Sequence, residues 1–222
     1  KDINCKYEFF IPDRNLDGYG PSIESFKKLI NKKIDIIITV DCGTLSYDAI
    51  EYAKKKQIDT IVLDHHQSEI KLPNAISLIN PNRYDDSSGL NYLCATAVVF
   101  IYLQNLIKKL KKLKWFESEK IIEPNIIKYL DLVALATICD VVPLKGINRS
   151  FVKQGLEILK KRENQGINNL LNLKEINSPI DTYHLGFLIG PMINAGGRLG
   201  FSSYGAKLLS TDSNIEAKKL SI

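Results

Sequence analysis

Two short apolar runs constrain the fold of this chain more than any other feature. Residues 34–40 (IDIIITV) and 60–63 (TIVL) are almost continuously apolar, and the segment between them has a helical pattern up to about residue 56. Such runs are typical of strands that are buried on both faces of a parallel sheet. Two more strand candidates, 6–11 (KYEFFI) and 75–79, and a helical pattern over about 21–33 extend the alternation. The first ninety residues therefore predict an α/β fold with a doubly wound, mainly parallel sheet.

The chain from residue 91 onward is predicted to be helical. Helical patterns cover about 91–113, 125–138, 149–162 and 182–194, and a last one begins at Ser203. We expect residues 1–90 to be the parallel α/β part of one domain and residues 91–200 its helical part, with a charged insertion near 114–124. Residues 201–222 are then predicted to begin a linker helix toward a further domain.

Composition places weak limits on partners and location. The net charge of +5 favours an anionic partner only weakly, because 25 of the 30 basic residues are Lys. The run 108–114 (KKLKKLK) is therefore predicted to be a solvated helix face, whereas the five arginines are more informative, since guanidinium binds phosphate in a bidentate manner. The longest apolar helix candidate, about 93–107, is shorter than the ~20 residues of a membrane span. Four widely spaced cysteines predict reduced thiols in a cytoplasmic protein without membrane attachment.

Polar side chains follow both apolar runs at their carboxyl ends. Asp41 follows the first run, and Asp64, His65 and His66 follow the second. Parallel strands bring their carboxyl ends to one rim of the sheet, so we expect these side chains to converge. Mixed carboxylates and imidazoles suit Mn²⁺ or Mg²⁺. A single Asp in such a place is more often a helix N-cap, but two imidazoles beside a carboxylate have no capping use.

Two later segments add candidates. Asp140 lies in the apolar run 131–144 (DLVALATICDVVPL), where a carboxylate is costly to bury unless it is paired or binds a metal. We predict a ligand role for Asp140, and Asp131 in the same run is the weaker candidate. The glycine-rich segment 186–200 ends beside Arg198, and the loop 11–20 carries Arg14; both suit phosphate contact. Each of these two segments is a weak signal alone, because Gly-Gly turns between helices are common.

The chain as a whole resembles a known family, the DHH phosphoesterases. It is most similar to their RecJ-type branch, which are single-strand-specific 5′→3′ DNA exonucleases. The resemblance covers nearly the whole chain and is carried by seven segments in this order: IPDRNLDGYG, ITVDCG, VLDHHQS, INPNR, DLVALATICDVVPL, NRSFVKQGLEIL and GPMINAGGRLG. Several motifs in one order are far more specific than a lone DHH.

The resemblance implies a site and an activity. It implies a catalytic set of Asp41, His65, His66 and Asp140, with metal ligation by Asp41, His65 and Asp140, phosphate contact by Arg14, His66, Asn194 and Arg198, and motif positions at Gly43, Asp64, Gly196 and Gly197. The implied reaction is hydrolysis of phosphodiester bonds in single-stranded DNA, assisted by two Mn²⁺ or Mg²⁺ ions, during DNA repair and recombination. Single-strand-binding protein and a helicase are further implied partners, and we expect a monomer.

One departure from the family pattern bears on activity. The family's first motif, a strand ending in metal-binding aspartates, is expected just upstream of Lys1 and is not in this sequence, and neither is the family's C-terminal DHHA1 domain. We therefore expect these 222 residues alone to have little turnover. Two alternatives stay open: a DHH phosphodiesterase for short oligonucleotides, cyclic dinucleotides or pyrophosphate, and a non-catalytic DHH-fold scaffold of DNA replication. The retained aspartates and histidines argue against the scaffold.

Overall fold

A three-stranded parallel sheet forms the first half of the molecule. The computed structural model describes residues 2–12, 20–177, 179–198 and 202–221. Strands β1 (Ile36–Val40), β2 (Asp59–Leu63) and β3 (Ser77–Ile79) are hydrogen-bonded side by side in the order β1-β2-β3. The predicted α/β class with a parallel sheet is therefore confirmed.

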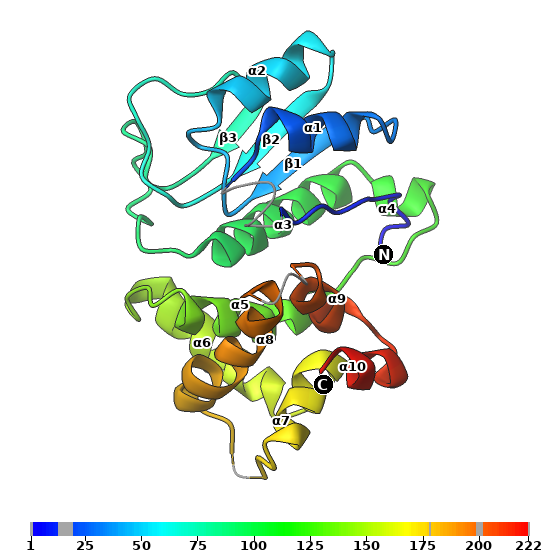
Figure 1. Ribbon diagram of the computed structural model, residues 1–222, viewed down its shortest axis with the longest axis vertical. Helices are drawn as coiled ribbons and strands as arrows, with labels where there is room; N and C mark the ends of the chain where they lie inside the picture. Colours follow the sequence, from blue (N-terminus) through cyan, green and yellow to red (C-terminus); the bar gives the residue numbers. More distant parts are fainter. Residues whose placement is uncertain (1, 13–19, 178, 199–201, 222) are drawn as a thin grey trace.

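Helices cover both faces of this sheet. Helices α1 (Ile23–Ile30) and α2 (Tyr47–Lys55) lie on one side, and the long helix α3 (Ala95–Lys112) lies on the other (Figure 1). Ser22 is the N-cap of α1 and forms a capping box with Ser25. A core of buried apolar side chains joins α1 and α2 to the sheet: Phe26, Ile37, Ala49, Ile50, Ala53, Val62 and Leu78.

The second half of the molecule packs around one central helix. Helix α5 (Leu130–Cys139) is apolar on all sides and contacts α3 and α6 (Gly146–Leu159). An all-round apolar helix is expected to be buried on all sides. The other elements are α4 (Trp115–Ser118), η1 (Ile126–Tyr129), α7 (Gln165–Leu173), the π-helical η2 (His184–Ile189), α8 (Gly190–Arg198), α9 (Tyr204–Ser210) and α10 (Asn214–Leu220).

Two strand predictions need correction. Residues 6–11 form no strand, because strand propensity alone does not make a ladder without a paired neighbour. Strand β1 buries only alternate residues and leaves Ile36, Ile38 and Val40 exposed, since no described strand or helix covers that side completely. The predicted domain boundaries at residues 90 and 200 stay predictions. Within the described residues, no helix is both long enough and apolar enough to cross a membrane.

Candidate metal centre

Two strand ends and one helix end supply the polar groups of the site. In the β1–β2 register Val40 lies beside Leu63, and the Asp41 N–H donates to the Leu63 carbonyl at 3.0 Å. Asp41 and Asp64 therefore leave the sheet at the same rim. Asp41 has a left-handed backbone (φ 61°), which turns the chain sharply away from β1. Asp140 reaches the same rim from the C-cap of α5.

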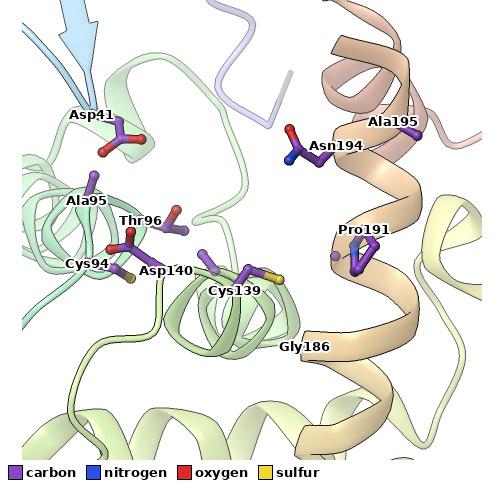
Figure 2. A pocket seen from close by; sticks show the side chains of 12 residues that line it. Asp41, Cys94, Ala95, Thr96, Cys139, Asp140, Gly186, Pro191, Asn194 and Ala195 are labelled. Atoms are coloured by element: carbon purple, nitrogen blue, oxygen red, sulfur yellow. The ribbon is translucent and has the colours of Figure 1, made fainter. Parts of the chain in front are cut away.

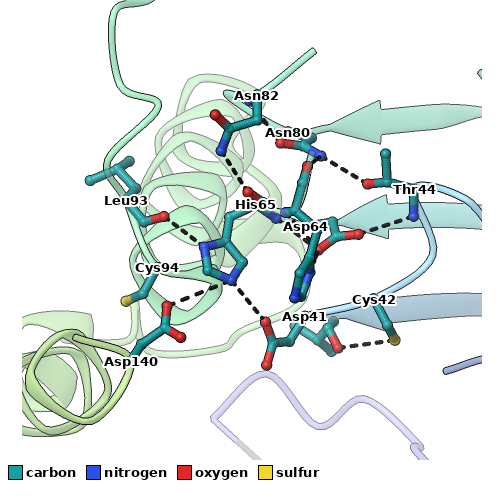
Figure 3. A network of polar contacts seen from close by, with 12 residues as sticks. Asp41, Cys42, Thr44, Asp64, His65, Asn80, Asn82, Leu93, Cys94 and Asp140 are labelled. Atoms are coloured by element: carbon teal, nitrogen blue, oxygen red, sulfur yellow. Dashed lines mark hydrogen bonds and ion pairs between the residues drawn. The ribbon is translucent and has the colours of Figure 1, made fainter. Parts of the chain in front are cut away.

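These groups converge around His65. The His65 Nε2 atom lies 3.2 Å from an Asp41 carboxylate oxygen and 3.6 Å from an Asp140 carboxylate oxygen (Figure 3). Potential ligand atoms of Asp41, His65 and His66 all lie within 4.8 Å of one another. Asp41 and Asp140, which are far apart in the sequence, thus share one cluster with His65, and the strand-end pattern and the run 131–144 had indicated all three.

The backbone around the site fixes how His65 presents its ring. The His65 Nδ1 atom lies 3.0 Å from the Leu93 carbonyl, which can only accept, so Nδ1 carries the proton. The lone pair of the neutral ring is then on Nε2, which faces both carboxylates. The hydrogen bond to Asp41 raises the pKa of His65 above its usual value. A divalent cation between the carboxylates would replace that proton.

Asp64 is buried beside the cluster and accepts hydrogen bonds from the loops that carry it. It is 1% exposed, and its carboxylate accepts the N–H groups of Thr44 at 3.0 Å and His65 at 2.8 Å and the His66 Nδ1–H at 2.7 Å. Burial by itself would raise the pKa of Asp64, but the hydrogen bonds from Thr44 and His66 outweigh it and lower the pKa. Asp64 is not a helix N-cap as the simpler interpretation held, because no helix lies between residues 64 and 94.

Opposing electrostatic effects act on the pKa of Asp140 within the cluster. Burial raises the pKa of Asp140, attraction to His65 opposes that shift, and repulsion from Asp41 adds to it. Carboxylates that repel one another beside imidazole nitrogens are the donor set that Mn²⁺ or Mg²⁺ would bind. The residues present therefore fit a divalent cation.

A pocket opens beside the cluster. It has a volume of about 580 Å³ and lies between the sheet rim, the start of α3, the end of α5 and helix α8. Asn194 points into it from α8, opposite Asp41 (Figure 2). Helix α3 begins at this pocket with Ala95 and has no side-chain cap, so its positive end faces the cavity. An anionic group in the pocket would meet this helix end and the metal centre together.

The remaining predicted site residues have mixed outcomes. Gly43 has φ 111°, and a Cβ there would lie only 2.4 Å from Thr39 Oγ1, so glycine is required. Gly196 and Gly197 lie inside α8 and not in a turn. Arg14 lies outside the described residues, as does the side chain of Arg198. Asp131 is not part of the cluster: it lies in the first turn of α5, about 13 Å along the axis from Asp140.

Sequence reasoning assigned no role to the residues that support the histidine loop, although the segment INPNR contains two of them. The supporting residues are Thr44, Asn80 and Asn82, together with the Leu93 carbonyl. A signal was available, since Asn80-Pro81-Asn82 follows β3 directly, and β3 ends at the same rim as β1 and β2.

Comparison with known proteins agrees with this fold. The model of the DHH family, N-terminal domain, matches residues 1–137. The chain therefore belongs to the DHH family. It is 36% identical to the single-stranded-DNA-specific exonuclease RecJ of Escherichia coli over 99% of this chain, and 29% identical to that of Bacillus subtilis over 98%. The chain spans 39% and 26% of the lengths of those two relatives.

Solved structures give the same relationship in space. A crystal structure of exonuclease RecJ bound to manganese matches with a TM-score of 0.79 and 30% identity, over 96% of this chain and 51% of that chain. RecJ from Thermus thermophilus in complex with Mn²⁺ matches with a TM-score of 0.72 and 28% identity, over 90% of this chain and 28% of that chain.

Proposed function

We propose that these residues form the metal-binding half of a single-stranded-DNA-specific 5′→3′ exonuclease that requires Mn²⁺ or Mg²⁺. The observation that carries the proposal is the convergence of Asp41, His65 and Asp140 at one rim, beside an open pocket. The similarity to RecJ proteins, two of them solved with Mn²⁺, supports the same reaction and metal. A cytoplasmic location, a monomeric state and partnership with a helicase or single-strand-binding protein stay predictions.

Each residue of the cluster has a definite task in this proposal. Asp41 and Asp140 would hold the cations through carboxylate oxygens, and His65 through Nε2, whose lone pair is set by the Leu93 hydrogen bond. When bound, divalent ions polarise the scissile phosphate and activate water for attack on phosphorus. The His66 Nδ1–H donates to Asp64. Its Nε2 atom would then be available to accept a hydrogen bond from a group bound in the site.

The pocket beside the cluster would hold the strand. The positive end of α3 favours a phosphate group there, and the Asn194 amide supplies neutral hydrogen-bonding groups. Contacts to phosphate and not to base edges would make binding salt-dependent and independent of base sequence. Arg14 and Arg198 stay predicted phosphate contacts.

A nuclease assay on a full-length protein that includes the family's first metal-binding motif tests the proposal, because these 222 residues alone are expected to have little turnover. With Mn²⁺ and a labelled single strand, we expect mononucleotides to be released progressively from the 5′ end, and little release from a blunt duplex of the same sequence. Asp41→Ala and His65→Ala should each abolish release. Full activity in either variant would contradict the metal assignment. Faster hydrolysis of a dinucleotide than of the long strand would instead favour the short-substrate phosphodiesterase.

A further inference from the structure

Two asparagines after β3, Asn80 and Asn82, donate hydrogen bonds to the backbone carbonyls of His65 and His66. Asn80 Nδ2 donates to the His66 carbonyl at 2.8 Å. Asn82 Nδ2 donates to the His65 carbonyl at 2.6 Å (Figure 3). The two asparagines are also joined to each other, because the Asn82 N–H donates to Asn80 Oδ1 at 2.8 Å. The carbonyl of each histidine is thus held by one amide of the same short segment.

Asn80 connects the loops at all three strand ends. Its Nδ2 atom also donates to Thr44 Oγ1 at 2.8 Å, in the loop after β1, and the Thr44 N–H donates to Asp64 after β2. Asn80 is 2% exposed, and Thr44 and Asp64 are each 1% exposed. Hydrogen bonds in such a buried network are stronger than in water, and losing one member leaves partners unpaired.

The histidine loop depends on side-chain hydrogen bonds, those to Asp64 among them, because it has no regular secondary structure of its own. Residues 64–76 form neither helix nor strand, and β3 is only three residues long. The His65 Nδ1–H reaches the Leu93 carbonyl only if the His65 backbone is held in its present position relative to the start of α3. A metal ligand must be placed to within about half an ångström for tight binding. Among the described contacts, Asp64 accepts the His65 N–H and Asn82 donates to the His65 carbonyl, so the two side chains together place the His65 backbone.

We propose that Asn80 and Asn82 are positioning residues that hold the His65–His66 pair in its metal-binding geometry, with Asn82 acting on His65 and Asn80 on His66. This inference rests on the proposed function, in which His65 is a metal ligand. Neither asparagine touches the cluster with its own side chain in the described contacts; both act through the histidine backbone. Residues that orient metal ligands in this indirect way typically change metal affinity by about 10- to 100-fold when removed.

A purely structural role predicts a different pattern, and the chain offers a matched control. Asn82 is only partly buried, so water can replace its amide in Asn82→Ala and the fold should survive. Asn164, the N-cap of α7, also donates its Nδ2 to a backbone carbonyl, that of Leu209 at 3.2 Å, and accepts the Ile167 N–H. Asn164→Ala likewise removes an amide that donates to a backbone carbonyl, but in the helical half, away from the metal centre.

The test measures metal affinity and ring chemistry separately in the full chain. In calorimetric Mn²⁺ titrations, Asn82→Ala should raise Kd by about 10- to 100-fold while Tm falls by less than about 4 °C. Asn164→Ala should lower Tm at least as much and leave Kd within about twofold of the parent. A Kd for Asn82→Ala within twofold of the parent, or an equal loss in Asn164→Ala, would overturn the proposal.

Nitrogen-15 NMR of the metal-free protein supplies the second readout. At a pH above the pKa of His65, the parent ring should show one tautomer with the proton on Nδ1, and Asn82→Ala should show a mixture of both. An unchanged His65 tautomer in Asn82→Ala would overturn the positioning role. Absence of Mn²⁺ binding by the parent would refute the proposed function instead, and the tautomer measurement would still decide the role of Asn82.

Discussion

Asp131 is predicted to destabilise the folded chain at neutral pH. It is 5% exposed within the first turn of α5, and the Leu132 N–H, at 2.7 Å, is the hydrogen-bond donor to its carboxylate among the described residues. Burial raises the pKa of Asp131 to about 6, with a small further rise from Glu163. Among the described residues no cation is paired with Asp131, so its ionised form is buried without an opposite charge.

The size of the effect follows from the two pKa values. An unfolded Asp has a pKa of about 3.9, so folding raises the pKa of Asp131 by about two units. That difference corresponds to a loss of about 3 kcal/mol in folding stability once the carboxyl is ionised. Because the folded pKa of this acid is raised, stability is lost as pH rises from about 4 to 6 and is not regained above 6. Asp131→Asn keeps the shape and the acceptor for Leu132 but cannot ionise. We therefore expect it to stabilise the protein by up to about 3 kcal/mol at pH 8, and by almost nothing at pH 4.

Urea unfolding of the parent and Asp131→Asn at several pH values measures this difference. Other carboxyls titrate in the same window, but they are common to both proteins and cancel in the comparison. The variant's advantage should grow from about pH 4 to pH 6 and then stay level. A pH-independent difference, or a variant less stable than the parent at pH 8, would refute the assignment of a buried, unpaired carboxylate.

Three further substitutions test other features of the structure. Gly155→Ala should destabilise the protein by about 1–3 kcal/mol in urea unfolding, although Ala normally favours helices, because its Cβ would lie 2.2 Å from a backbone carbonyl of α5; a gain in stability would contradict that close approach. Gly43→Ala should lower both Tm and Mn²⁺ affinity, since φ 111° and the contact with Thr39 disfavour any side chain, and unchanged affinity in titrations would show that the Asp41 loop tolerates it. Asp64→Asn should cost roughly 1–3 kcal/mol, because its amide would turn a donor toward the buried Thr44 N–H; an unshifted denaturation midpoint would count against this network.

The sequence alone determined the class of fold and most of the candidate cluster. The apolar runs that became β1 and β2 are local patterns, and the polar residues after them must lie at one rim once the strands are parallel. Asp140 was identified for a related reason, since a carboxylate in an apolar run is costly without a partner. Asp131 met the same criterion and lies outside the cluster, because one helix separates the two residues by its whole length.

Only the tertiary structure decided how the histidines are held. The hydrogen bonds from Asn80 and Asn82, and the one from His65 to Leu93, join loops that are distant along the chain. Such contacts leave no periodic pattern in the sequence, because each depends on how the loops at the ends of different strands are placed relative to one another. Burial follows the same rule: the run that forms β1 is continuously apolar, yet its alternate residues are exposed, since burial depends on what packs against a strand and not on its own composition.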